Sequence, residues 1–215
     1  MWQQFADALV RQVLQAPALT AEALTLRERF RLRRHRVTPS AEAVAGDVVR
    51  IVGRAVEREG GVSALSGAPC TAHRVVVEQG MWSSEEARAS GLGGRHRPQG
   101  RYHWVRWIDE VSPADLLVED ATGTARCRLA DARVLHWEPI QWLYGATPAL
   151  TERFRIHPET YVRWFEVIVK PAAEVTVLGI AHWEKAAEQQ STYRGTPRNL
   201  VIQAPPRGQI DVLIG

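Results

Sequence analysis

A series of short β-type segments, which occupies the sequence from Asp47 onward, constrains the fold of this 215-residue chain more than any other feature. The segments are rich in β-branched and aromatic residues, and stretches with Gly, Pro and Asp separate them. They are Val48–Val56, Thr71–Gln79, Tyr102–Ile108, Leu116–Val118, Thr124–Leu129, Tyr161–Val169, Val175–Ala181, Asn199–Gln203 and Gln209–Ile214. Short strands at hairpin spacings predict a mainly β fold, a partly closed antiparallel β-barrel that is OB-like, because closure hides the sheet edges.

Glycines refine this prediction at three places. Gly53 interrupts the first segment, which is typical of a strand that bends where a barrel closes. Glu119–Gly123 lies between two alternating segments and predicts a hairpin in which Gly123 takes the positive φ of the turn. Residues 80–100 hold five Gly and few apolar residues, so we expect a long exposed loop there.

The N-terminal part of the chain has a helical pattern instead. Apolar side chains recur at helical spacing over residues 2–14 and predict an amphipathic helix. Its apolar stripe is the expected interface with the rest of the protein or with a second copy, and it includes Trp2, Phe5, Leu9 and Val13. Residues 24–33 fit both a strand and a helix, and we interpret them as a second helix. The sequence thus predicts a helical extension with a basic segment over 1–36 and a β-domain over 37–215.

Arginine carries almost all of the positive charge, since only Lys170 and Lys185 among the 27 basic residues are lysine. A coding bias toward GC-rich codons explains a general excess of this kind. Residues 27–36 stand above that background, because they hold six Arg and one Glu. Such a run repels itself unless it is solvated or bound to a partner. Its members are therefore candidate binding residues: Arg27, Arg29, Arg31, Arg33, Arg34 and Arg36.

A second candidate surface combines tryptophan with arginine in one predicted strand. Trp104 and Trp107 are three residues apart, so we expect them on opposite faces, one buried and one exposed. An exposed Trp beside Arg101 and Arg106 is typical of platforms that stack the bases of single-stranded nucleic acid. The alternative is that these Trp side chains only fill the barrel and cover its surface.

Composition and motifs exclude several other classes. Two cysteines, Cys70 and Cys127, supply neither a disulfide framework nor a four-ligand zinc module. Apolar runs fall short of the roughly 18 residues that cross a bilayer, and the first residues do not form a signal peptide. We therefore expect a cytoplasmic protein that reaches a membrane only through a partner.

Catalytic chemistry is not indicated by any spacing in the sequence. Cys70 and His73 are three residues apart, which places them on opposite faces of a strand, so we expect a structural cysteine rather than a nucleophile. The seven His residues show no metal-ligand spacing. We accordingly predict no catalytic residue, no metal and no cofactor.

Four blocks of sequence, in order, resemble the GIDE-type domain, also called the "beside a membrane" domain. They are Gly46–Gly53, Leu65–Arg74, Glu119–Gly123 and Val169–Gly179, and the resemblance covers roughly residues 37–214. The Leu-Ser-Gly-Ala-Pro-Cys run at the start of the second block is the most specific of them. Proteins of this family include a mitochondrial ubiquitin ligase and bacterial membrane proteins.

The sequence also departs from that family. Ubiquitin ligation in the family resides in a zinc-binding RING domain, for which Cys70 and Cys127 do not provide the ligands, so this activity is not implied. Transmembrane helices, which accompany the domain in its relatives, are not predicted here. What the resemblance implies is a non-catalytic interaction or sensing module that acts through contacts with a protein partner or as a homo-oligomer. The alternative is a barrel that binds single-stranded nucleic acid.

Overall fold

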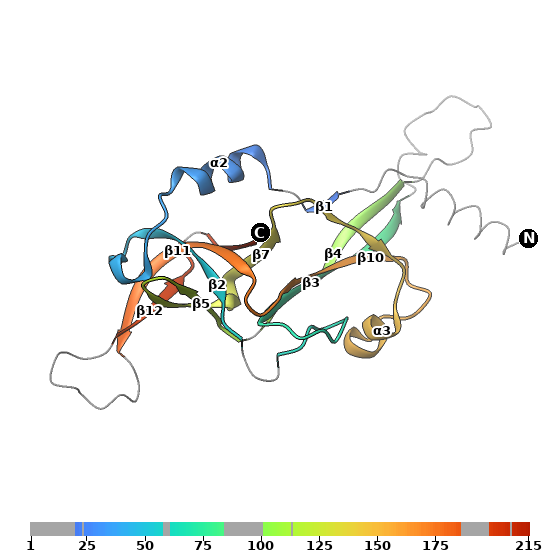
Figure 1. Ribbon diagram of the computed structural model, residues 1–215. Helices are drawn as coiled ribbons and strands as arrows, with labels where there is room; N and C mark the ends of the chain where they lie inside the picture. Colours follow the sequence, from blue (N-terminus) through green and yellow to red (C-terminus); the bar gives the residue numbers. More distant parts are fainter. Residues whose placement is uncertain are drawn as a thin grey trace, which may run out of the picture.

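In a computed structural model, the described residues form a mainly β fold with a seven-stranded sheet, a four-stranded sheet, a two-stranded ribbon and two α-helices (Figure 1). The structure describes residues 20–22, 24–57, 61–83, 101–112, 114–185, 198–206 and 208–215. The expected helix over residues 2–14, with Trp2, Phe5, Leu9 and Val13, lies outside these residues. The mainly β prediction is confirmed.

A seven-stranded sheet forms the larger half of the fold. Its strands, in spatial order, are β12 (Arg198–Gln203), β6 (Gly123–Cys127), β5 (Leu116–Asp120), β2 (Val48–Ala55), β11 (Glu174–Lys185), β13 (Ile210–Ile214) and β7 (Ala132–His136). β12 also pairs with β11, so the sheet partly closes on itself through β2, β5, β6, β12 and β11. This partial closure agrees with the predicted barrel and is consistent with an OB-like arrangement.

The pairing in this sheet is mixed rather than purely antiparallel, which corrects the prediction. β12 pairs with β6 in parallel, and β13 pairs with β7 in parallel. The cause is that the two C-terminal strands, β12 and β13, both pair with β11. β12 pairs with Ile180–Lys185 and β13 with Val175–Leu178, both antiparallel, so the two strands follow one another along the same edge instead of forming a hairpin.

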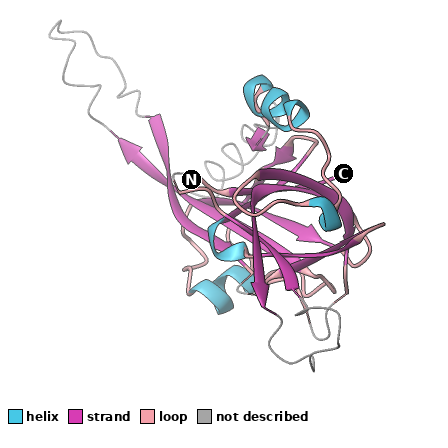
Figure 2. Cartoon of the chain, turned by 90° about the vertical axis from the view of Figure 1, so that its left-hand side faces the viewer, coloured by secondary structure: helices cyan, strands magenta, loops and turns pink. Residues whose placement is uncertain are grey.

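The second sheet has four strands in the order β4 (Arg101–Val111), β3 (Ala72–Ser83), β10 (Val162–Val169) and β9 (Leu143–Tyr144). A separate short ribbon pairs β1 (Thr20–Glu22) with β8 (Ile140–Gln141). β10 pairs with β3 only as far as Gln79, so the end of the β3–β4 hairpin extends beyond the sheet, as Figure 2 shows. Residues 80–83 are thus strand and not part of the exposed loop expected over 80–100, and residues 84–100 lie outside the described part.

The main hydrophobic core lies between the two sheets. Phe165 and Val167 of β10 and Val76 of β3 belong to the same buried cluster as Val177 of β11 and Ile202 of β12. Each of these side chains is at most 2% exposed. This is the packing that alternation in the sequence predicts, because one face of each strand is apolar.

Two α-helices pack on the outer faces of the sheets. α2 (Leu26–Arg34) lies over the seven-stranded sheet, which confirms the helical interpretation of that segment (Figure 1). α3 (Pro148–Phe154) begins at the Thr147 cap with Pro at its first position, and it buries Leu150 against β3. Two short 3-10 turns, Ser40–Glu42 and Leu129–Asp131, complete the described helical elements.

The predicted β5–β6 hairpin is present, but its turn does not use a glycine with positive φ. Asp120 accepts hydrogen bonds at one carboxylate oxygen from the backbone N–H groups of Thr122 (2.7 Å) and Gly123 (3.0 Å). Its other oxygen accepts from the backbone N–H (2.7 Å) and hydroxyl (2.8 Å) of Ser40. An Asp side chain that satisfies the turn in this way removes the need for a left-handed residue. The prediction for the φ of Gly123 was therefore wrong.

No helix among the described residues combines the length and the apolar composition that a bilayer crossing needs.

Candidate binding surface

The basic segment becomes the α2 helix because its first turn is capped. Thr25 is the N-cap: its hydroxyl accepts from the backbone N–H of Glu28 (3.2 Å), and the Glu28 carboxylate accepts from the backbone N–H of Thr25 (2.8 Å). This reciprocal capping box satisfies N–H groups that a helix start leaves without partners. Glu28, the one acidic residue of the run, is thus used to start the helix.

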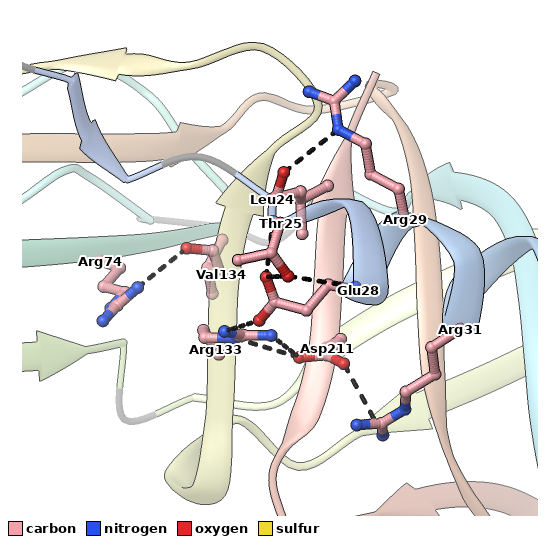
Figure 3. A network of polar contacts seen from close by, with 9 residues as sticks. All are labelled: Leu24, Thr25, Glu28, Arg29, Arg31, Arg74, Arg133, Val134 and Asp211. Carbon is pink, nitrogen blue, oxygen red and sulfur yellow. Dashed lines mark hydrogen bonds and ion pairs between the residues drawn. The ribbon is translucent and has the colours of Figure 1, made fainter.

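Glu28 also fixes α2 to the sheet through an arginine of β7. Arg133 donates to Glu28 (2.6 Å) and to Asp211 of β13 (2.9 Å and 3.1 Å), as Figure 3 shows. Arg31 of α2 lies 3.8 Å from the other oxygen of Asp211. A bridging guanidinium between two carboxylates from different elements holds both in a defined geometry.

These contacts shift the pKa values of Glu28 and Arg133. Burial alone raises the pKa of the Glu28 carboxyl, but hydrogen bonds from Thr25 and Arg133 outweigh it and hold that pKa below its ordinary value. Burial likewise disfavours the charged form of Arg133, yet Glu28 and Asp211 raise its pKa. The ionised forms of Glu28 and Arg133 are therefore favoured near neutral pH.

The side of α2 that faces the seven-stranded sheet is apolar. Leu24, just before the helix, and Leu32 within it are 6% and 1% exposed. They pack against Leu135 of β7, Leu178 of β11 and Leu213 of β13. Arg29 adds two bonds to backbone carbonyls, those of Leu24 (3.3 Å) and Trp137 (3.1 Å). The helix is therefore held by packing as well as by charge.

The outer side of α2 faces solvent and is basic. Phe30 and Arg34 lie opposite Leu32 at helical spacing, and Phe30 is 70% exposed. Arg33 and Arg34 are exposed, and so is Arg36 just beyond the helix end. None of these three guanidinium groups has an acidic partner within the described residues. We call Phe30, Arg33, Arg34 and Arg36 the α2 outer face.

The predicted arginine cluster therefore divides into two groups. Arg29 is engaged in holding the helix, and Arg31 is half-exposed beside Asp211. Arg33, Arg34 and Arg36 remain available on the outer face. The side chain of Arg27 is outside the described part of the structure. Sequence alone did not indicate this division, since it depends on Arg133 and Asp211, which lie far along the chain in unrelated strands.

The second predicted surface, on β4, is occupied by internal contacts. Trp104 packs against Tyr161 (ring centroids 5.1 Å apart) and Tyr144 (6.0 Å), and the Arg163 guanidinium of β10 lies 4.4 Å from its ring centre. The same guanidinium lies 4.2 Å from the ring centre of Trp142. Arg163 is thus sandwiched between two Trp rings and is not available as part of an open stacking platform.

Arg106 also has acidic partners within the sheet. It lies 3.1 Å from Asp109 and 3.5 Å from Glu78. Asp109 also accepts two 2.8 Å hydrogen bonds from Arg74. Glu78 pairs with Arg163, which continues a chain of alternating charges across β3, β4 and β10. We call this chain the charge ladder, and it consists of Arg74, Asp109, Arg106, Glu78 and Arg163.

Trp107 is the part of the second predicted surface that remains accessible, with 49% of its surface exposed. Trp104 is half-buried, so the expectation of one buried and one exposed Trp describes this pair in part. The alternation that predicted it is interrupted, because the β3–β4 register shifts between Val77 and Glu78. The side chain of Arg101 lies outside the described structure.

Cys70 and His73 do contact one another, which corrects the expectation that they face apart. The Cys70 sulfur lies 3.9 Å from Nδ1 of His73, and the Ser112 hydroxyl lies 3.0 Å from the same nitrogen. Strand alternation does not apply, because β3 begins only at Ala72. All three side chains are at most 7% exposed, and burial raises the pKa of the Cys70 thiol. A buried thiol of this kind is a weak nucleophile.

Within the described ranges, no three His, Cys, Asp or Glu side chains gather in a way that would hold a metal ion. Comparison with known proteins gives no matching family model, no matching curated protein and no matching solved structure. The resemblance to the GIDE-type domain therefore stays a prediction, and the α2 outer face is the candidate binding surface.

Proposed function

We propose that this protein is a non-catalytic binding module that recognises an acidic segment of a protein partner through the α2 outer face. The observation that carries this proposal is the presence of three exposed guanidinium groups, without acidic partners among the described residues, beside a 70% exposed phenyl ring. They lie on, or just beyond, a helix that the Glu28–Arg133–Asp211 network and Leu32 hold in place. A pre-organised surface loses less conformational entropy when it binds.

The composition of this face favours a protein partner. Arginine and aromatic side chains dominate the energetics of protein interfaces, and an exposed Phe between arginines offers an apolar anchor with charged surroundings. Base stacking, the basis of the nucleic-acid alternative, requires an exposed Trp beside Arg101 and Arg106. Trp104 and Arg106 are engaged in internal contacts, so Trp107 is the part of that predicted platform that stays accessible among the described residues.

The chemistry of the interior also favours binding over catalysis. The Cys70, His73 and Ser112 side chains form the arrangement closest to a nucleophile and base among the described residues. Burial lowers the pKa of His73 and raises that of Cys70, so the neutral forms of both are favoured. The interaction role agrees with what the resemblance to the GIDE-type domain implies.

Fluorescence anisotropy tests the proposal with two probes, an acidic peptide of Asp, Glu and Leu and an oligothymidylate of equal net charge. We expect the full chain to bind the peptide and to bind it more tightly at low salt. The variant that combines Arg33→Gln, Arg34→Gln and Arg36→Gln should bind the peptide about tenfold more weakly or worse.

The matched control removes the same charge elsewhere, by combining Arg54→Gln, Lys170→Gln and Lys185→Gln at exposed positions outside α2. It should bind the peptide as the unmodified chain does. Equal loss in both variants would mean that net charge alone drives binding and would overturn the assignment to α2. Binding of the oligothymidylate alone would replace the protein partner with single-stranded nucleic acid.

A further inference from the structure

The β4 strand forms one edge of the four-stranded sheet, and β9 forms the other. β4 pairs with β3 over Arg101–Val111, and no strand among the described residues pairs with its other side (Figure 1). β7, which also approaches β4, is linked to the face of this sheet rather than to its edge, since Arg74 donates to the carbonyl of Val134 (3.4 Å). Alternate residues of this eleven-residue strand thus present backbone N–H and C=O groups outward.

This edge is eleven residues long, and its middle combines apolar side chains with the charged residues Arg106, Asp109 and Glu110. Val105 and Trp107, in the middle of the strand, are 47% and 49% exposed. No proline occurs between Arg101 and Val111. Proteins normally shorten, charge or cover such an edge, because a long apolar edge is a template for another strand. An edge of this length and exposure is therefore suited to an occupant.

Contacts on the two sides of the sheet show which β4 residues share a face. Arg106 and Asp109 share one face, because they contact each other and both belong to the charge ladder. Ile108 and Glu110 lie on the other, where Ile108 packs against the Val75 and Val77 cluster and Glu110 pairs with Arg153 of α3. The register shift at Trp107 explains why residues 106 and 109, three apart, share a face.

We propose that β4 pairs antiparallel with β4 of a second copy of this chain, with the two-fold axis between Trp107 and Ile108. In this register Arg106 lies opposite the partner's Asp109, and Trp107 lies opposite the partner's Ile108. Val105 lies opposite the partner's Glu110. The Arg106–Asp109 pair joins residues of the same face, and the two-fold axis repeats every pair. The two four-stranded sheets thereby join into one continuous sheet.

The order of charged residues along β4 favours a second copy of this chain as the strand that pairs with β4. Arg106 precedes the centre of the strand and Asp109 and Glu110 follow it, so opposite charges meet only when an identical strand runs in the reverse direction. A shift of one residue would place the ladder face of one copy beside the opposite face of the other. The apolar pair at the axis, with charged pairs on both sides, matches the usual order of an interface.

Light scattering after size-exclusion chromatography, over a series of protein concentrations, tests the proposal on the full chain. We expect a dimer that dissociates on dilution. Two substitutions at one exposed position provide the matched pair. Val105→Glu places a carboxylate opposite the partner's Glu110 and should weaken the dimer at least tenfold. Val105→Lys places an ammonium group there and should leave the dimer as stable or more stable.

A monomer at every concentration would overturn the proposal. A dimer that tolerates Val105→Glu would place the interface elsewhere, and equal loss with Glu and Lys would overturn the register. Circular dichroism of both variants establishes that they fold. Peptide binding by α2 is a separate measurement, so this dimer and the proposed partner recognition succeed or fail independently.

Discussion

Gly53 is the residue at which closure of the larger sheet is most sensitive to a side chain. A Cβ atom there would lie 2.3 Å from the backbone carbonyl oxygen of Glu119 and 2.9 Å from a methyl group of Val118, both in the neighbouring strand β5. We expect Gly53→Ala to separate β2 from β5 and to lower the free energy of unfolding by about 1–3 kcal/mol. Urea unfolding followed by tryptophan fluorescence measures this change.

Gly123→Ala is the control for that substitution. A Cβ at Gly123 would have its closest contact at 3.7 Å, an ordinary van der Waals distance, and its φ is not positive. We expect a change of less than about 0.5 kcal/mol. Equal destabilisation by both alanines would show that the close approach at Gly53 does not determine stability.

At the scale of single residues, the sequence predicts a role correctly when residues nearby in the chain determine it. The prediction fails when a residue far along the chain determines the role. Gly53 was predicted to mark a bend where the barrel closes, and the structure shows a close approach of β5 to β2 at this residue. Gly123 did not need its positive φ, because Asp120 accepts from the turn and from Ser40, about eighty positions away. The Cys70–His73 contact was missed because strand alternation was applied to Cys70, which lies before the start of β3.

The attachment of α2 depends more on Arg133 than on the arginines of the helix itself. Arg133→Gln leaves the carboxylates of Glu28 and Asp211 without their main cation, and Asp211 is 5% exposed. We expect a loss of about 2–3 kcal/mol in the free energy of unfolding. Arg33→Gln, on the outer face, should change it by less than about 0.5 kcal/mol. Urea unfolding of the two variants, which differ equally in charge from the parent, measures both changes in the free energy of unfolding. Equal changes would contradict the role given to Arg133.

The charge ladder stabilises the second sheet through Glu78. This carboxylate pairs with Arg163 and Arg106, and its side chain is 10% exposed. Glu78→Gln should leave the Arg163 guanidinium between Trp104 and Trp142 without its counter-charge and should cost about 2–4 kcal/mol. Thermal unfolding measures the loss. Glu152→Gln, at an exposed position of α3, is the control and should leave the midpoint unchanged within about 1–2 °C.

At the element scale, hydrophobic alternation predicted the long strands, whereas it missed short ones whose existence depends on partners. The sequence indicated β2, β3, β4, β10 and β11, each with an apolar face. β7 was missed because its five residues include Arg133 and His136, and β8 and β9 have two residues each. The parallel pairing of β12 with β6 and of β13 with β7 has no signal in the local sequence, because it follows from the positions of β12 and β13 beside β11.

The whole molecule should lose stability in acid through carboxylates with depressed pKa values. Burial opposes ionisation of Asp120, but hydrogen bonds from Thr122 and Ser40 lower its pKa to about 2. The pKa values of Glu28 and Asp109 are also lowered. A depressed pKa in the folded state contributes stability that is present above the ordinary pKa and disappears as pH falls toward the folded value.

We therefore expect the free energy of unfolding to fall as pH decreases from about 5 to 2, with about 1–2 kcal/mol of the decrease due to Asp120. Urea unfolding at a series of pH values measures the slope. Asp120→Asn should be less stable than the parent at neutral pH, and the difference should shrink toward pH 2. A difference that is constant with pH would contradict the role given to the ionised carboxylate.

The path of the two C-terminal strands along one edge of β11 has a consequence for synthesis on the ribosome. β6 and β7 receive their parallel neighbours from residues 198–214, so both strands remain without these neighbours while the preceding part of the chain emerges. Contacts between such distant segments form late and slowly. A nascent chain of this protein thus completes its fold only after translation has passed residue 214, and until then a chaperone has exposed strand edges to protect.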